Sequence, residues 1–260
     1  MKVQCKYSET GLGLVFGKSQ IWLDSQAIEC SMKEELVIIE TQDGSHSIYS
    51  PSFGVSYHSK YGAIQESQHV FIEAGLFEAS LAKKDLHILE IGFGTGLNAL
   101  MTRIEADRRQ LHIEYTTVEN YPVPVQEAIQ LNYPETLQEI SYRPDFEKMH
   151  QLEWGVKEEF KSNFTFTKLQ QTFQSLLFDE QFDLIYFDAF APSAQPELWE
   201  TEVLGIMYRA LRDNGILVTY CAKGAVKRSL KSLGFTVESL QGPPGKREMT
   251  RAKKAKALRL

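Results

Sequence analysis

The chain has 260 residues, of which 43% are hydrophobic and 24% charged, and a net charge of −6, as expected for a globular protein. It contains no apolar run of membrane-spanning length and no signal-peptide core near its start, so we expect a cytoplasmic protein without membrane contact. Three cysteines and six histidines are scattered without ligand or disulfide spacing, so we expect no metal.

The charge is unevenly distributed. Residues 223–260 contain eleven Lys and Arg against two Glu, so the remainder of the chain is strongly acidic. A basic face on an acidic body is typical of proteins that bind a polyanion, although a solvated basic tail is an equally good explanation of the last eleven residues.

In chain order, residues 1–35 give no clear signal. The segment ELVIIETQDGSHSIYS, residues 35–50, predicts a β-hairpin that turns at Asp43 and Gly44. We therefore place a small β-rich extension over residues 1–60 and a second domain over residues 61–260.

From about residue 86, apolar runs alternate with amphipathic segments. We expect strands at residues 87–91, 112–118, 163–167, 182–187 and 215–220. We expect helices after a glycine-rich turn through Asp107 and at residues 123–132, 170–178, 196–211 and 224–233. This alternation predicts an α/β fold with a doubly wound, mostly parallel sheet, whose ligands bind at the carboxyl ends of the strands.

The strongest motif is the glycine-rich turn at residues 90–98, EIGFGTGLN, which follows a strand and opens a helix. Gly92 and Gly94 allow close approach of a ligand, and Gly96 allows tight packing at the helix start. Leu97 stands where a dinucleotide fingerprint has its last glycine. The motif instead resembles motif I of the class I (Rossmann-like) S-adenosylmethionine-dependent methyltransferases, which implies that Glu90 orients the methionine end of that cofactor.

A carboxylate also ends the next strand, at Glu119. At that position it can accept both ribose hydroxyls of a nucleoside cofactor, although a surface acid is the simpler alternative. Together with the glycine-rich turn, Glu119 favours a cofactor that contains adenosine.

Asp188 follows an apolar strand and begins the turn DAFAP, with Pro196 and Trp199 beyond it. This segment closely resembles the family that completes 5-methylaminomethyl-2-thiouridine at the tRNA wobble position. Further similar segments are residues 57–59, 62, 66–72, 119–122, 224–230 and 245–249, so that the resemblance spans roughly residues 37–252. In this family the methyltransferase either stands alone or is half of a bifunctional protein, and we expect the flavin-dependent oxidase half to be absent here.

The resemblance implies S-adenosyl-L-methionine as cofactor and tRNA, through its anticodon region, as substrate. It also implies a functional link to the enzymes that install the aminomethyl group. Where relatives have a Gly-Asp pair after the third strand, this chain has Lys168, so adenine recognition falls to backbone groups or Gln170. The predicted cofactor residues are Tyr57, Glu66, Glu90, Gly92, Phe93, Gly94, Thr95, Gly96, Asn98, Glu119, Gln170 and Asp188.

Asp188 is the predicted catalytic residue, because an ammonium must lose a proton before its nitrogen can attack a methyl group. The alternative role of Asp188 is a turn or helix cap. We expect Phe190 to stack on the substrate base and Pro192 to shape the pocket, although Phe190 could instead be core packing. The predicted phosphate contacts are Lys223, Lys227, Arg228, Lys246 and Arg247.

Two other functions stay open. A polyamine aminopropyltransferase or another small-amine methyltransferase would share the fold, but the former normally has a GGGxG loop and a D-x-x-D pair. A non-catalytic binding protein would have a degraded pocket, whereas Glu90, Glu119 and Asp188 are all present.

Overall fold

The computed structural model describes residues 4–8, 11–16, 19–22 and 36–256. The chain forms two compact units, residues 1–35 and 36–260. The first unit is an antiparallel sheet in the order β1-β2-β3, with bounds Gln4–Ser8, Gly11–Phe16 and Ser19–Trp22. The unit boundary lies after Glu35 and not at residue 60, so residues 36–60 group with the larger unit.

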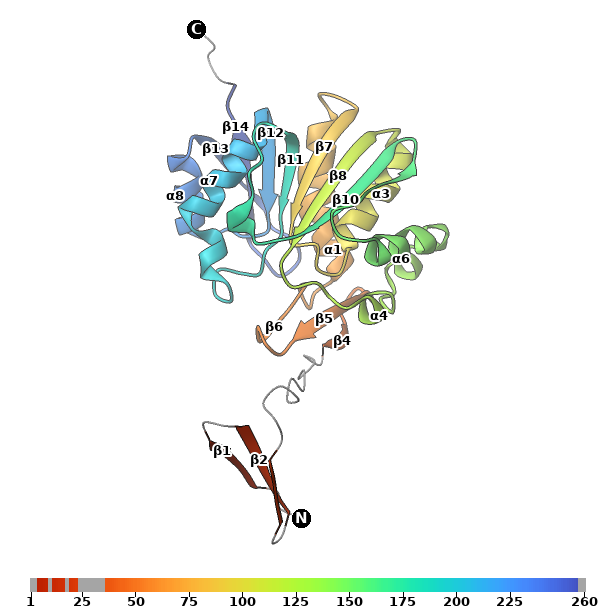
Figure 1. Cartoon of the computed structure of the whole chain (residues 1–260). Helices are drawn as coiled ribbons and strands as arrows, with labels where there is room; N and C mark the ends of the chain where they lie inside the picture. The colour runs from red at the N-terminus through yellow and green to blue at the C-terminus, as the bar shows by residue number, and fades with distance from the viewer. Residues whose placement is uncertain (1–3, 9–10, 17–18, 23–35, 257–260) are drawn as a thin grey trace. The chain divides into compact units, whose positions relative to one another are not determined.

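The larger unit is built on an eight-stranded sheet in the order β13-β14-β12-β11-β7-β8-β10-β9 (Figure 1). Its central strands β12, β11, β7, β8 and β10 are parallel, and the pairs β10–β9, β12–β14 and β13–β14 are antiparallel. The prediction of a doubly wound, mostly parallel sheet is therefore confirmed. The strands are β7 (Asp85–Ile91), β8 (His112–Glu119), β9 (Lys157–Lys161), β10 (Phe164–Gln170), β11 (Phe182–Phe187), β12 (Leu211–Thr219), β13 (Phe235–Gln241) and β14 (Glu248–Lys254).

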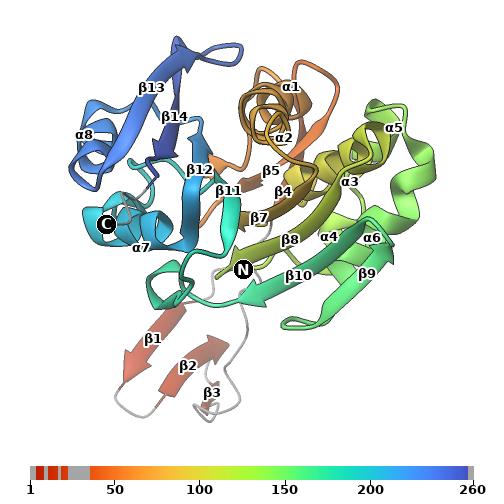
Figure 2. The ribbon, with the colours of Figure 1, turned by 90° about the horizontal axis from the view of Figure 1, so that it is seen from above.

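Helices cover both faces of this sheet (Figure 2). One face carries α3, α6 and a continuous helical segment made of α1, η1 and α2, of which η1 is a wide π-type helix. The other face carries α7 and α8. The bounds are α1 (Ala63–Ser67), η1 (Gln68–Phe77), α2 (Glu78–Ser80), α3 (Leu97–Arg109), α4 (Val125–Ala128), α5 (Tyr133–Thr136), η2 (Ile140–Tyr142), α6 (Arg143–Gln151), η3 (Phe173–Ser175), η4 (Pro196–Trp199), α7 (Thr201–Ala210) and α8 (Gly224–Ser232). No helix in the described part of the chain is both long and apolar enough to span a membrane.

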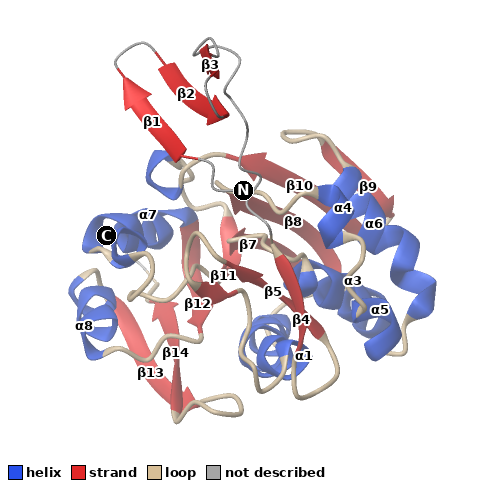
Figure 3. Cartoon of the chain, turned by 90° about the horizontal axis from the view of Figure 1, so that it is seen from below, coloured by secondary structure: helices blue, strands red, loops and turns tan. Residues whose placement is uncertain are grey.

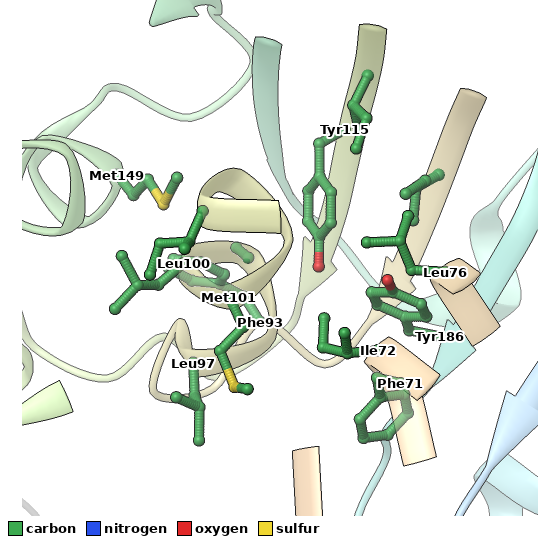
Figure 4. Close-up of a cluster of buried hydrophobic side chains, with 14 of the residues drawn as sticks. Phe71, Ile72, Leu76, Phe93, Leu97, Leu100, Met101, Tyr115, Met149 and Tyr186 are labelled. Atoms are coloured by element: carbon green, nitrogen blue, oxygen red, sulfur yellow. The ribbon is translucent and has the colours of Figure 1, made fainter. Parts of the chain in front are cut away.

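Strand β11 shows why its sequence is a continuous apolar run. Leu184 and Tyr186 belong to the core under α3 and η1, whereas Ile185 and Phe187 belong to the core under α7 and α8. A strand buried on both faces needs apolar residues at every position. Figure 4 shows the first core, where Tyr186 lies beside Phe71 and the other η1 side chains.

A second small sheet, β4-β5-β6, lies at the carboxyl ends of the parallel strands (Figures 1 and 3). Its strands are Val37–Glu40, His46–Ser50 and Val55–Ser56. The side chain of Asp43 accepts the Ser45 backbone N–H at 3.0 Å and Gly44 has φ of 80°, so the predicted hairpin and its turn are confirmed.

The helix predicted at residues 123–132 is instead the short α4 and α5. Asn132 lies between them, where its side chain accepts the His46 N–H at 2.8 Å and donates to the Gly44 carbonyl at 2.9 Å. Pro134 has no N–H to continue a helix. At residues 170–178 only η3 is helical, because β10 continues to Gln170 and pairs there with Glu119.

Candidate active site

The glycine-rich turn connects β7 to α3 at the carboxyl edge of the sheet. Gly92 and Gly94 have φ of 92° and 50°, a left-handed conformation that side chains rarely adopt. A Cβ at Gly92 would lie 2.7 Å from the Asp188 carbonyl oxygen, and one at Gly94 would lie 2.9 Å from the Tyr57 ring. The turn therefore depends on glycine for its conformation and for the close approach of its neighbours.

This turn forms one wall of a cavity of about 510 Å³. The other walls come from the β5–β6 loop, from α1 and from the segments that follow β8, β10, β11 and β12. The residues that line it include Phe53, Tyr57, His58, Glu66, Phe93, Thr95, Asn98, Glu119, Asn120, Tyr121, Thr172, Phe173, Gln174, Asp188, Phe190, Gln195, Tyr220 and Lys246. The cavity thus lies where ligands bind in doubly wound sheets.

Glu119 ends β8 and points its buried carboxylate into this cavity. It accepts backbone N–H groups from Gly94 at 3.1 Å and from Asn120 and Tyr121 at 2.8 Å each. Burial raises the pKa of Glu119, and these three N–H groups act against that rise. The donors fix the carboxylate at the cavity wall, in position to accept a pair of ligand hydroxyls.

Asp188 begins the turn after β11, and its carboxyl group faces the same cavity. The Asn98 side-chain amide donates to its Oδ2 at 2.8 Å, and its own N–H donates to the Ile91 carbonyl at 3.0 Å. Burial, followed by the nearby Glu66 carboxylate, raises the pKa of Asp188 to about 7. A carboxyl group with that pKa can exchange a proton near neutral pH.

Glu90 lies behind Asp188 and is completely buried. Burial raises its pKa to about 8, so Glu90 carries a proton at neutral pH. Thr117, Asn98 and Tyr115 approach it, yet neither carboxyl oxygen has a hydrogen-bond partner of normal geometry among the described residues. The Asn98 amide oxygen is likewise unpartnered there, so a polar ligand or water can complete this group.

Aromatic side chains gather around Phe190 at the cavity. The ring of Phe190 lies 5.1 Å from that of Phe53 and 4.9 Å from that of Tyr57, and Phe53 lies 5.6 Å from Tyr121. The turn that carries Phe190 is held by Trp199, whose indole donates to the Phe190 carbonyl at 2.7 Å. The result is a supported aromatic surface beside Asp188.

Comparison with known proteins identifies the family. Residues 127–255 match the model of a family of S-adenosyl-L-methionine-dependent methyltransferases. The chain belongs to the S-adenosyl-L-methionine-dependent methyltransferases. Its cofactor is therefore S-adenosyl-L-methionine, as the glycine-rich turn predicts.

Two relatives are more specific. The tRNA 5-methylaminomethyl-2-thiouridine biosynthesis bifunctional protein MnmC of Marinomonas sp. is 32% identical over 220 residues, which are 78% of this chain and 32% of that protein. The crystal structure of MNMC2 from Aquifex aeolicus superimposes with a TM-score of 0.66 at 26% identity, covering 86% of this chain and 72% of that one. The chain thus spans about a third of the length of the curated relatives it matches.

A spermidine synthase from Thermotoga maritima also superimposes, with a TM-score of 0.51 at 14% identity over 98% of this chain and 73% of that one. This likeness shows the shared fold alone.

The cavity of this methyltransferase fits its cofactor. The glycine-rich turn leaves room for a ligand beside backbone groups, Glu119 presents a carboxylate for ribose hydroxyls, and the unpartnered Asn98 oxygen can accept from an amino group. Among the described residues no cluster of three or more His, Cys, Asp or Glu side chains could hold a metal ion.

Most of the predicted site residues come together in the cavity. Those that line it are Tyr57, Glu66, Gly92, Phe93, Gly94, Thr95, Asn98, Glu119, Asp188, Phe190 and Lys246. The other predicted residues do not line it: Glu90, Gly96, Gln170, Pro192, Lys223, Lys227, Arg228 and Arg247. Gly96 supports the turn from behind, where a Cβ would lie 2.7 Å from His150 Nε2.

The two residues considered for adenine recognition, Gln170 and Lys168, do not line the cavity. Gln170 is the exposed last residue of β10 and lies outside the cavity, whereas Thr172, Phe173 and Gln174 line it. Lys168 is buried on the far side of β10, where its Nζ donates to the His150 carbonyl at 2.5 Å. The alternation of side chains along a strand thus turns Lys168 away from the cofactor site.

The five predicted phosphate contacts differ in their exposure and in their partners. Lys223, Arg228 and Arg247 are exposed. Lys227 instead forms an ion pair with Glu248 at 2.7 Å, and Lys246 points inward to Glu66 at 2.5 Å.

Sequence reasoning missed several cavity residues. Tyr121 lies two residues after the end of β8 and Tyr220 directly after the end of β12, so the strand-end rule could have found both. Phe53 and His58 come from the small sheet, whose position over the site has no local sequence signal.

Proposed function

We propose that this enzyme is an N-methyltransferase that converts 5-aminomethyl-(2-thio)uridine to 5-methylaminomethyl-(2-thio)uridine at the wobble position of tRNA. The observation that carries the proposal is the Asp188 carboxyl group, which faces the cofactor cavity with a pKa of about 7 and is oriented by Asn98. Its similarity to the tRNA 5-methylaminomethyl-2-thiouridine biosynthesis bifunctional protein MnmC and to MNMC2 supports it.

The chemistry requires a base at this position. S-adenosyl-L-methionine supplies an electrophilic methyl group bound to a sulfonium. The acceptor arrives mainly as an ammonium, whose nitrogen has no free lone pair. Asp188 would take one proton from it, and the freed nitrogen lone pair could then accept the methyl group, with the sulfonium leaving as a neutral thioether. Holding the two groups in line supplies much of the remaining rate acceleration.

Residues of this chain would hold the two reactants in separate parts of the cavity. We assign Glu119 to the ribose hydroxyls and the backbone of Gly92 and Gly94 to the polar end of the cofactor. Glu90 would act indirectly, by holding Asn98 and Asp188 from behind. The adenine would lie near Tyr121 and Phe173, which are wall residues beyond Glu119.

The acceptor base would stack on the aromatic surface formed by Phe53, Tyr57 and Phe190. Single-stranded bases are commonly recognised by stacking on aromatic side chains, as the anticodon loop permits. The exposed Lys223, Arg228 and Arg247 then supply candidate phosphate contacts. A cytoplasmic location and cooperation with the enzymes that make the aminomethyl group belong to the same proposal.

The proposal is tested by incubating the protein with labelled S-adenosyl-L-methionine and tRNA from cells that lack this step. The digested tRNA should contain labelled 5-methylaminomethyl nucleoside, and Asp188→Ala should reduce it at least about 100-fold. If the tRNA carries no label, and the protein instead transfers an aminopropyl group from decarboxylated S-adenosyl-L-methionine to putrescine, the enzyme is an aminopropyltransferase.

A further inference from the structure

Lys246 lies in the loop between β13 and β14 and reaches into the active-site cavity. Its ammonium group lies 2.5 Å from Glu66 Oε1 and 3.7 Å from the centroid of the Tyr220 ring. The second Glu66 oxygen accepts the Ser59 N–H at 3.0 Å. The ion pair and the cation–π contact hold this ammonium at the wall of the active-site cavity, paired with a carboxylate.

The surroundings of Asp188 therefore contain a defined set of charges. Glu66 of α1 contributes a negative charge and Lys246 a positive one. The other titratable groups near Asp188 are Glu90 on β7, Tyr115 on β8 and Tyr220 after β12. Burial raises the pKa of all three, so that they are neutral at neutral pH. Glu119 and Glu197 line the same cavity but are not among the charges that shift the pKa of Asp188. We call the surroundings of Asp188, Glu66 and Lys246 the acceptor pocket; with Asp188 ionised, it contains two carboxylates and one ammonium.

We propose that Lys246 determines acceptor specificity by leaving the acceptor pocket with one net negative charge, which matches an acceptor whose reacting end carries a single positive charge. Without Lys246, the pocket would hold two uncompensated carboxylates and would favour an acceptor with two amino groups. This role rests on the proposed function for the nature of the acceptor, but the charge set by Lys246 can be measured without any acceptor.

The ion pair also gives an unusually direct test. Glu66→Gln and Lys246→Met break the same contact between α1 and the β13–β14 loop, so a purely structural role predicts the same effect from both. Their charges, however, act on Asp188 in opposite directions. Loss of the ammonium removes a cation that favours the carboxylate, and loss of Glu66 removes an anion that disfavours it.

The first measurement is the ¹³C NMR titration of the Asp188 carboxyl in the isolated protein, assigned with Asp188→Asn. We expect its midpoint to move up by about one pH unit in Lys246→Met and down by about one in Glu66→Gln. Lys246→Arg should stay at the wild-type value. Lys253→Met is the matched control, because Lys253 lies on β14 outside the cavity and pairs with Glu78 of α2 at 2.7 Å. This variant should not move the midpoint. Movement of both test variants in one direction, or no movement, overturns the proposal.

The second measurement compares methyl transfer to two tRNAs, one with an aminomethyl and one with a 2-aminoethylaminomethyl group on the wobble uridine. Lys246→Met should shift the ratio of kcat/KM values toward the doubly charged acceptor by about tenfold, and an unchanged ratio contradicts the specificity role. If the wild type methylates neither tRNA, the proposed function fails, while the titration still decides whether Lys246 sets the charge of the pocket.

Discussion

Replacing Glu90 by Gln tests whether the buried carboxyl behind the active site carries a proton. A pKa of about 8 in the fold, against an ordinary 4.5, corresponds to about 5 kcal/mol of preference for the protonated form. Between these two pH values the unfolded chain loses the Glu90 proton and the folded protein keeps it. The contribution of Glu90 to the free energy of unfolding therefore falls as the pH rises through this window.

Gln resembles the protonated acid in shape and can donate to the unpartnered Asn98 oxygen, but it has no proton to lose. Relative to wild type, Glu90→Gln should gain stability from pH 5 to 8.5 by at most about 5 kcal/mol, or about 10 °C in Tm for a protein of this size. Thermal melts at several pH values measure this difference. Glu114→Gln is the control, because Glu114 is a partly exposed residue of β8 that pairs with Lys157 at 2.9 Å. A Tm difference between Glu90→Gln and wild type that is independent of pH would show that folding does not raise the pKa of Glu90.

Three further predictions concern the reaction. Wild-type kcat/KM should rise with pH and level off above about 7 as Asp188 ionises. Asp188→Asn should be at least about 100-fold slower and should not show that rise, and a rise that persists in this variant would come from another group. Glu119→Gln should weaken cofactor binding about 10- to 100-fold by calorimetry, because charged hydrogen bonds contribute about 1.5–3 kcal/mol, and an unchanged Kd contradicts its role. Phe190→Ala should raise KM for tRNA about tenfold while leaving the cofactor Kd unchanged, whereas parallel losses in both would mean that Phe190 only supports the fold.

The fold and the cofactor were predictable because local patterns encode them. A strand such as β11 needs an apolar residue at every position when both faces are buried, and the turn after β7 needs glycine wherever φ is positive. The strand-end rule then brings Glu119 and Asp188 to one cavity, although they are far apart in sequence.

The acceptor side of the cavity was less predictable, because it depends on contacts between distant segments. Lys246 and Glu66 are 180 positions apart, and the sequence alone identified Lys246 only as one of several basic residues. Lys168 was read as a change at the cofactor site, but the pleat of β10 turns it to the other side. Such assignments depend on register and on loop placement, which a local pattern does not specify.

The most direct test of the central claim compares acceptors that differ only at the reacting group. Wild-type protein and labelled S-adenosyl-L-methionine are incubated with a tRNA that carries 5-aminomethyluridine at the wobble position, and with the same tRNA carrying plain uridine there. We expect one labelled methyl group on the aminomethyl nitrogen of the first tRNA and none on the second. Equal labelling of both tRNAs, or labelling at another position, would contradict the claim that Asp188 activates an amine on a tRNA base.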